Sequence, residues 1–349
     1  MIRKSVQSLT PYTPGEQPKI ANLVKLNTNE NAYPPSPKVV AALRDFNTSA
    51  LNLYPDPLCI RIRENLAAQH NCSIDNIFVG NGSDEVLRLA TYAWVEDDGA
   101  IGYFSPSYSL YPVLADIRDV KHVTCALPNI GELTNSLQAL KGQTLPDLFF
   151  IANPNAPTST QFSKNEMQTF CANYSGVVFI DEAYVSFAAE DCVELACSMP
   201  NVIVCRTLSK AWSLAGVRLG YAIGPAPLIE ALYKIKDSYN VNALTQAVAI
   251  AALSDPGWML INRNKIVATR NRLTQSLREL GWTVADSETN FLWCMPPPPA
   301  SAESIWTMLR NNNIVVRYFP GPETGTHIRI TIGTDEQTNF LLDVLRKEL

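Results

Sequence analysis

The chain has 349 residues, 46% of them hydrophobic, and a formal net charge of −5. This length allows a large domain with a smaller companion, and the acidic balance argues against nucleic acid or an anionic membrane as the main partner. No run approaches the roughly 20 apolar residues of a membrane span, and no signal peptide is evident. We therefore expect a cytoplasmic protein.

The cysteines and histidines do not indicate a metal site or a disulfide framework. Eight cysteines are scattered without a C-x-x-C pair, and the chain has three histidines. This spacing matches neither a zinc site nor a set of disulfides. Several cysteines lie in apolar runs such as VIVCR, where cysteine behaves as a small hydrophobic residue.

After a proline-rich start, short apolar runs alternate with helical patterns along the chain. Strands are predicted at 76–80, 99–104, 121–127, 147–153, 176–181, 202–206 and 218–224, and helices at 83–95, 108–118 and 163–174. This alternation predicts an α/β fold whose central sheet is mainly parallel and covered by helices on both faces. Ligands of such sheets bind beyond the carboxyl ends of the strands.

A long helical pattern from 255 to about 280 is expected to lead into a second, smaller α+β domain. We predict four parts: an N-terminal segment over 1–40 that packs with the small domain, a large domain over 41–255, a bridging helix over 256–280 and the small domain over 281–349.

The first candidate site is the glycine turn VGNGSDEVLRLA, which follows the strand at 76–80. Gly80 and Gly82 permit close approach of the backbone, and Ser83 and Asp84 open a helix whose free N–H groups suit a phosphate. An ordinary turn with Asp84 as a capping residue is the alternative. The segment has neither the P-loop order nor a G-x-G-x-x-G pattern, so it is weak evidence alone.

Asp181 ends the apolar strand GVVFID. A carboxylate at this position is costly to bury unless a cation or a hydrogen-bond donor pairs with it. A protonated ring nitrogen of a cofactor would be such a donor. The alternative is a structural helix cap.

Lys210 lies in the run TLSKAWSLAGVRLGY, directly after the strand VIVCR and among small, hydroxyl and apolar residues. A nucleophilic amine must be partly neutral, and desolvation or a nearby cation lowers its pKa. Arg218, eight residues further on, has a guanidinium suited to phosphate. A solvated surface lysine is the commoner alternative.

In this order, the segments GNGSDE, NPNAPT, FIDEAY and TLSKAWSLAGVRLGY resemble the fold-type-I aminotransferases, which depend on pyridoxal 5′-phosphate (PLP). The segments SLTPYTPG, KLNTNENAYPPSP, YPDP, SETNF and RITIG look like the class II histidinol-phosphate aminotransferases. The resemblance implies a large PLP-binding domain, a smaller α+β domain and a place in histidine biosynthesis. The implied reaction moves the amino group between L-histidinol phosphate and 2-oxoglutarate, giving imidazole-acetol phosphate and L-glutamate.

The resemblance also implies roles for the residues that match its motifs. Lys210 would hold PLP as a Schiff base and move the α-proton, while Asp181 would pair with the pyridine nitrogen. Tyr184 would donate to the 3′ oxygen of the ring, and Tyr108 would stack on the ring face, although a packing role in a helix is the alternative for Tyr108. The residues implied around the cofactor phosphate are Gly82, Ser83, Asp84, Ser209 and Arg218.

At the substrate end, Arg329 lies in THIRITIG, on the face of a predicted strand opposite three isoleucines. Its position matches the carboxylate binder of the family, and it would serve carboxylate and phosphate in turn. Tyr12, Tyr54 and Arg317 match positions around the substrate phosphate. Tyr54 would come from the neighbouring subunit, which implies a homodimer; for Arg317 an exposed arginine at a strand end is the alternative.

One segment departs from the family pattern. The family shows Asn before PTG, where it reaches the 3′ oxygen of the cofactor, but this chain has NPNAPTS with Ala156 at that position and Ser159 in place of glycine. Alanine cannot donate a hydrogen bond. We therefore expect either that Asn155 reaches the cofactor instead or that the bond is absent.

Three other functions stay open at this stage. An aromatic amino acid aminotransferase would need no phosphate subsite. A PLP-dependent lyase or decarboxylase acting on a phosphorylated amino acid would need no 2-oxo acid. A PLP-binding regulatory protein usually carries an attached DNA-binding module, for which this chain offers no segment, since the motifs begin near Leu9.

Overall fold

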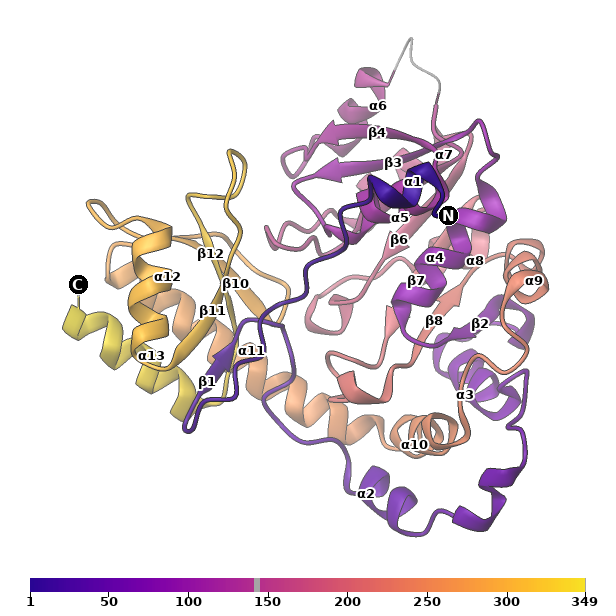
Figure 1. Cartoon of the computed structure of the whole chain (residues 1–349), viewed down its shortest axis with the longest axis horizontal. Helices are drawn as coiled ribbons and strands as arrows, with labels where there is room; N and C mark the ends of the chain where they lie inside the picture. The colour runs from indigo at the N-terminus through magenta and orange to yellow at the C-terminus, as the bar shows by residue number, and fades with distance from the viewer. Residues whose placement is uncertain (141–144, 349) are drawn as a thin grey trace.

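The computed structural model describes residues 1–140 and 145–348, which form two β-sheets connected by a long helix (Figure 1). The larger sheet has seven strands in the order β2-β8-β7-β6-β5-β3-β4. Its strands are β2 (Ile77–Gly80), β3 (Ala100–Ser105), β4 (Lys121–Ala126), β5 (Leu148–Ala152), β6 (Val177–Asp181), β7 (Val202–Thr207) and β8 (Gly220–Ile223). The five strands from β7 to β4 are parallel, and β8 runs antiparallel to both β2 and β7. The expected mainly parallel, mixed sheet is confirmed.

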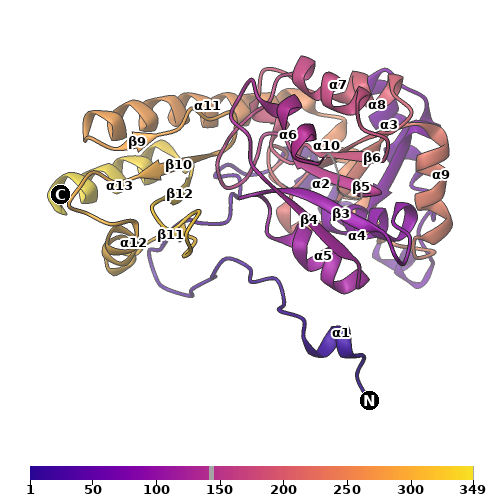
Figure 2. The same cartoon turned by 90° about the horizontal axis from the view of Figure 1, so that it is seen from above.

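Helices cover both faces of this sheet (Figure 2). One face carries α3 (Ile60–His70), α7 (Lys164–Ala172), α8 (Val193–Ser198) and α10 (Ala243–Leu253), and the other carries α4 (Ser83–Trp94), α5 (Leu110–Arg118) and α9 (Ala226–Ile235). Alternate strand residues enter the two cores: Val178 and Ile180 join one, and Phe179 joins the other. Both faces of each strand are therefore apolar, as burial on both sides requires.

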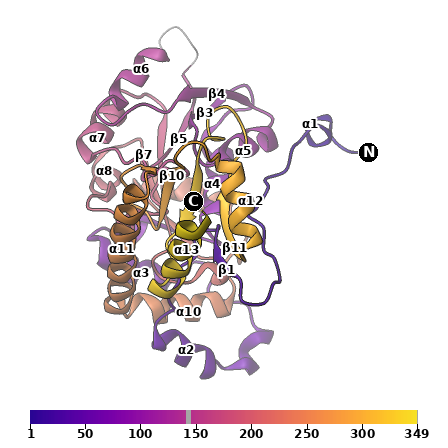
Figure 3. The same ribbon diagram turned by 90° about the vertical axis from the view of Figure 1, so that its left-hand side faces the viewer.

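The smaller sheet has the order β1-β11-β12-β10-β9. It comprises β1 (Val24–Leu26), β9 (Thr283–Val284), β10 (Phe291–Met295), β11 (Ile314–Tyr318) and β12 (Ile328–Thr331). Its core is shared with α11 (Pro256–Glu279), α12 (Ala302–Asn311) and α13 (Asp335–Glu348), which lie together in Figure 3. The parallel pairing of β1 with β11 ties the N-terminal segment to this sheet. The domain boundaries themselves stay a prediction.

The remaining α-helices of the described residues are short: α1 (Lys4–Gln7), α2 (Pro37–Arg44) and α6 (Ser136–Ala139). Local signals fix several helix ends, such as the capping box of α7, in which Ser163 and Glu166 bond reciprocally. Within the described ranges, no single helix is long and apolar enough to cross a membrane. Only α10 and α11 taken together, with a bend of 78° between them, have the required length and composition.

An ion cluster of Arg206, Glu182 and the exposed Asp191 lies beside the carboxyl ends of β6 and β7. Arg206 donates from Nε to Oε2 of Glu182 at 2.8 Å, and its Nη2 lies 2.9 Å from Oδ2 of Asp191. The Glu182 side chain is fully buried, and its Oε1 accepts from the backbone N–H of Cys192 at 2.6 Å. The buried Glu182 carboxylate can stay charged at low cost only while the Arg206 guanidinium is paired with it.

We expect Arg206→Met to lower the free energy of unfolding by about 3–5 kcal/mol, because the substitution leaves Glu182 charged, buried and without its cation. Replacing both partners, as in Arg206→Met with Glu182→Leu, should recover most of this loss. Lys164→Met is the matched control, because it breaks an exposed pair with Glu194 and should cost less than about 1 kcal/mol. Urea unfolding measures all three, and an Arg206→Met variant within 1 kcal/mol of the wild type contradicts the expectation.

Candidate active site

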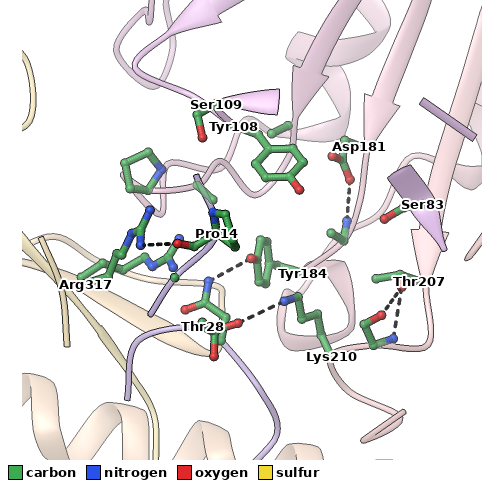
Figure 4. A pocket seen from close by; sticks show the side chains of 18 of the residues that line it. Pro14, Thr28, Ser83, Tyr108, Ser109, Asp181, Tyr184, Thr207, Lys210 and Arg317 are labelled. Atoms are coloured by element: carbon green, nitrogen blue, oxygen red, sulfur yellow. Dashed lines mark hydrogen bonds between the residues drawn. The ribbon is translucent and has the colours of Figure 1, made fainter. Parts of the chain in front are cut away.

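A cavity lies at the carboxyl ends of the central strands and is closed by the smaller sheet and the N-terminal segment (Figure 4). It brings together eleven of the fourteen residues predicted from the sequence. These are Tyr12, Ser83, Asp84, Tyr108, Asp181, Tyr184, Ser209, Lys210, Arg218, Arg317 and Arg329. Gly82, Tyr54 and Asn155 are not part of its lining.

Lys210 enters the cavity from the loop after β7. Its Nζ donates to the backbone carbonyl of Thr28 at 3.4 Å and lies 5.5 Å from the centre of the Tyr184 ring (Figure 4). Across the described part of the chain, no carboxylate lies within ion-pair distance of this amine. A partly buried lysine held by a carbonyl fits a reactive amine better than a solvated surface lysine.

Asp181 ends β6, next to β7 in the sheet, and is buried. Its Oδ2 accepts from Tyr111 Oη at 3.0 Å, and its Oδ1 accepts from the N–H of Ala183 at 3.1 Å. Burial raises the pKa of Asp181 to about 6, although both hydrogen bonds and the Lys210 cation act in the opposite direction. The carboxylate therefore lacks a full charge partner of its own, which a protonated ring nitrogen would supply.

Tyr111 was not identified from the sequence. It is fully buried in α5, and its ring stacks on Phe150 at 4.9 Å. Burial and the neighbouring Asp181 raise the pKa of this phenol well above its ordinary value, so it acts as a fixed donor. Its position, 70 residues before Asp181, gave no local signal, since a tyrosine in an amphipathic helix is ordinary packing.

The start of α4 forms a cradle for an anion. Gly82 is the N-cap, with φ +83°, and no side chain at this position caps the first N–H groups of the helix, so within the described residues they remain available to a ligand. A Cβ on Gly82 would lie 2.6 Å from Arg218 Nη2, and one on Gly220 would lie 2.3 Å from the nitrogen of Ser83. Glycine is therefore required at both positions, and the guanidinium lies beside the helix end, where a phosphate is favoured.

Asp84 orients this cradle instead of capping the helix. Its Oδ2 lies 3.1 Å from Nη2 of Arg218, and its Oδ1 accepts from Tyr108 Oη at 3.3 Å. The carboxylate thus fixes two side chains of the cavity. Ser209 contributes a hydroxyl that accepts from Thr207 Oγ1 at 2.9 Å.

Arg329 and Arg317 lie at the other end of the cavity. The partly buried Arg329 donates from Nη2 to the carbonyl of Asn27 at 2.9 Å, and its buried Nε has no partner among the residues that the structure describes. Burial lowers the pKa of its guanidinium. Arg317 donates to the carbonyls of Thr13 and Pro14 at 3.1 and 3.3 Å. Both cations are held by neutral oxygens and stay available to an anionic ligand.

Of the two alternatives for Asn155, the structure favours the one in which the bond to the cofactor is absent, because Asn155 is not part of the cavity lining. Its amide donates to the carbonyl of Pro106 at 3.0 Å and to Thr158 Oγ1 at 2.8 Å, and its Oδ1 accepts from Ser107 Oγ at 2.5 Å. The side chain is committed to holding two loops together. Ala156 lines the cavity instead and offers no side-chain donor.

Tyr54 lies outside the cavity of its own chain. It is 80% exposed and stacks on Tyr239 with 4.3 Å between the ring centres. A role in the site of a neighbouring subunit stays a prediction.

The segment after β1 contributes contacts that the sequence reasoning missed. Asn29 donates from Nδ2 to Tyr184 Oη at 2.9 Å, and Asn31 donates to the backbone carbonyl of Lys210 at 3.0 Å. The available signal was three asparagines at alternate positions, Asn27, Asn29 and Asn31, directly after a short strand, because asparagine favours irregular backbone and local hydrogen bonds.

Taken together, the lining residues fit a phosphorylated aromatic aldehyde with a basic ring nitrogen. The start of α4 and Arg218 suit the phosphate, Asp181 suits the protonated nitrogen, and Lys210 suits the aldehyde. The buried carboxylate without a charge partner is the observation that favours this group over a neutral ligand.

Three comparisons with known proteins agree with this arrangement. The sequence model of the family described as aminotransferase class I and II matches residues 21–345. Histidinol-phosphate aminotransferase 2 of Thiobacillus denitrificans is 42% identical over 347 residues, 98% of this chain and 96% of that protein. The histidinol-phosphate aminotransferase of Gluconacetobacter diazotrophicus is 42% identical over 346 residues, 97% and 95% of the two chains.

Among solved structures, the histidinol-phosphate aminotransferase from Sinorhizobium meliloti in complex with pyridoxal-5′-phosphate is similar to this chain. Its TM-score is 0.89 at 25% identity, and the match covers 100% of this chain and 98% of that one. This similarity confirms the predicted fold class.

In cofactor-free protein, we expect Asp181→Asn to raise the free energy of unfolding at pH 7 by up to about 3 kcal/mol. The folded carboxyl has a pKa of about 6 against its ordinary 3.8. The folded state therefore binds this proton more tightly, and its stability falls as the pH rises from about 4 to 6. The Asp181→Asn variant has no carboxyl to ionise, so its stability should not fall over this range. The free energies of unfolding of the two proteins should therefore differ least near pH 4.

Urea unfolding of both proteins from pH 4 to pH 7 measures the difference. Asp98→Asn, which alters an exposed carboxylate, is the control and should leave the pH dependence unchanged. A variant no more stable than the wild type at pH 7 would contradict the proposed burial cost.

Proposed function

Since the chain belongs to the class I and II aminotransferase family, we propose that it transfers the amino group between L-histidinol phosphate and 2-oxoglutarate, giving imidazole-acetol phosphate and L-glutamate. The chain is a PLP-dependent transaminase. The substrates and the role in histidine biosynthesis are the proposed part. They are supported by two relatives named histidinol-phosphate aminotransferase, each 42% identical to this chain. The cytoplasmic location stays a prediction.

The observation that carries the substrate proposal is the pair of arginines at the end of the cavity away from the α4 cradle. Within the described residues, the partly buried Arg329 has no carboxylate partner, and Arg317 is bonded to carbonyl oxygens only. Two cations held near each other without a carboxylate favour an anion on the ligand. Histidinol phosphate brings a phosphate and glutamate brings carboxylates, so the same arginines serve both half-reactions.

Some residues of the cavity bind the cofactor, and one of them transfers the proton. PLP, when bound, supplies an aldehyde that takes up the amino group and a ring that stores the electron pair of the broken C–H bond. Ser83, Ser209 and Arg218 would hold its phosphate, and Asp181 would keep the ring nitrogen protonated. Lys210 Nζ would take the proton from the substrate carbon as a general base and return it as a general acid.

The proposal predicts a fast half-reaction with histidinol phosphate in the absence of any 2-oxo acid. The visible absorption of the bound cofactor should bleach rapidly with this donor and slowly with phenylalanine. Arg317→Ala should slow the reaction of histidinol phosphate about 10- to 100-fold, because a hydrogen bond to a charged group is worth about 1.5–3 kcal/mol. The variant should leave the phenylalanine reaction nearly unchanged.

Two outcomes would replace the proposal. Equal or faster bleaching with phenylalanine indicates an aromatic amino acid aminotransferase, and turnover that needs no 2-oxo acid indicates a lyase or decarboxylase. Lys210→Ala should lower turnover at least about 100-fold in each case, since it removes the proton carrier. Arg272→Ala, an exposed arginine paired with Asp335, is the control and should change neither donor reaction.

We further propose that two chains form a homodimer in which Tyr54 completes the site of the partner subunit. Tyr54 lies beside the exposed apolar side chains of Leu51 and Leu53, 52% and 66% exposed. Such a cluster on one surface indicates a protein interface. The proposal places the Tyr54 hydroxyl near the substrate phosphate.

Mixing inactive variants tests this arrangement. Lys210→Ala and Tyr54→Ala chains should each have low activity, whereas mixed dimers regain one complete site, with Lys210 from one chain and Tyr54 from the other. Random pairing should restore about a quarter of the wild-type activity. No recovery after subunit exchange, shown by co-purification of two differently tagged chains, means that Tyr54 does not act across the interface.

A further inference from the structure

We propose that Asn29 is a positioning residue that directs the hydroxyl proton of Tyr184 into the cavity. Asn29 lies three residues after β1, lines the cavity and is 1% exposed. Its φ is +55°, in the left-handed region that Gly, Asn and Asp adopt most readily. The inference rests on the cofactor placement proposed above, because the Tyr184 proton acts on that group.

Thr331 sets the orientation of the Asn29 amide. The backbone N–H of Asn29 donates to Thr331 Oγ1 at 3.0 Å, so this oxygen accepts. The single hydroxyl proton of Thr331 then goes to Asn29 Oδ1 at 2.9 Å. Asn290 Nδ2 donates to the backbone carbonyl of Asn29 at 3.0 Å and holds the residue from the other side. With Oδ1 bound to Thr331, the amide presents its Nδ2 to Tyr184.

This orientation decides which way the Tyr184 hydroxyl donates. Asn29 Nδ2 lies 2.9 Å from Tyr184 Oη and can only donate, so the phenol oxygen accepts and its own proton is left over. Within the described residues, no protein group accepts that proton. Tyr184 lines the cavity, as Figure 4 shows, so the remaining acceptor is an oxygen of the bound ligand.

The neighbouring residues Asn155 and Ala156 offer no second side-chain donor into the cavity, so the Tyr184 proton has no substitute there. Ala156 lines the same cavity without a polar side chain, and the Asn155 amide is bound to Pro106 and Thr158. Of Asn155, Ala156 and Tyr184, Tyr184 is thus the residue whose side chain has a proton to donate to the 3′ oxygen of the cofactor. The charged and titratable groups near Tyr184 include Lys210, 5.5 Å from its ring centre, the partly buried Arg329 and Tyr108.

The test follows the visible absorption of the bound cofactor against pH in the complete enzyme, with no substrate added. Donation to the 3′ oxygen stabilises its ionised form, so loss of the donor should raise the pH midpoint of the absorption change. Tyr184→Phe should raise it by about one pH unit, as expected for one hydrogen bond. Asn29→Asp should raise it nearly as much, because a carboxylate only accepts and draws the Tyr184 proton away from the cavity.

Asn29→Gly keeps the left-handed backbone and leaves the tyrosine free to rotate, so it should shift the midpoint by less than half as much as Asn29→Asp. A merely structural role predicts the reverse order, since glycine removes the whole side chain and aspartate nearly preserves its shape. Asn22→Asp is the matched control: it alters an exposed asparagine of the same segment with φ +56° and should cause no shift.

A double variant separates the hydrogen bond from the added charge. If Asn29 acts through Tyr184, Asn29→Asp should shift the midpoint little further in a Tyr184→Phe background. A full additional shift there, or a larger effect of glycine than of aspartate, overturns the inference. An unchanged midpoint in Tyr184→Phe alone overturns the proposed cofactor contact of Tyr184 instead, and neither result depends on which amino donor the enzyme uses.

Discussion

The parallel pairing of β6 and β7 is the constraint on which the site depends. Asp181 is the last residue of β6 and lies in register with Cys205, while β7 ends at Thr207, three residues before Lys210. Parallel neighbours end at the same edge of a sheet, so the carboxylate and the amine reach one place. Because the strands leading there are buried on both faces, solvent cannot balance these charges, and a ligand must.

The N-terminal segment completes the cavity through backbone oxygens. The pairing of β1 with β11 fixes the segment between the two sheets, and carbonyl groups of Asn27 and Thr28 then accept from Arg329 and Lys210. A carbonyl orients a cation without cancelling its charge. The cations are therefore held in position while their charge stays available to an anion. A carboxylate partner would have neutralised that charge.

Residues at strand ends could be placed from the sequence, because an apolar run followed by a polar residue is a local signal. Parallel strands end at the same edge of a sheet, so such residues are expected to lie close together. Contacts between distant segments could not. Asn29 and Tyr184 are 155 residues apart, and Tyr111 supports Asp181 across 70 residues. The sequence left two alternatives for Asn155, because its sequence neighbours do not show that the loop at Pro106 and Ser107 binds its amide.

The charge of the cavity opposes the charge of the whole chain. The chain has a net charge of −5, yet the cavity is lined by four basic side chains (Lys210, Arg218, Arg317 and Arg329) and two carboxylates (Asp84 and Asp181). Asp84 pairs with Arg218, whereas Arg317 and Arg329 have no carboxylate partner among the described residues and lie together at the end of the cavity away from α4. An acidic surface repels anions in general, whereas this end attracts them locally. A ligand with a phosphate or a carboxylate at this end gains from both arginines, which a neutral aromatic side chain cannot do, and this electrostatic difference is the physical basis of the proposed phosphorylated donor.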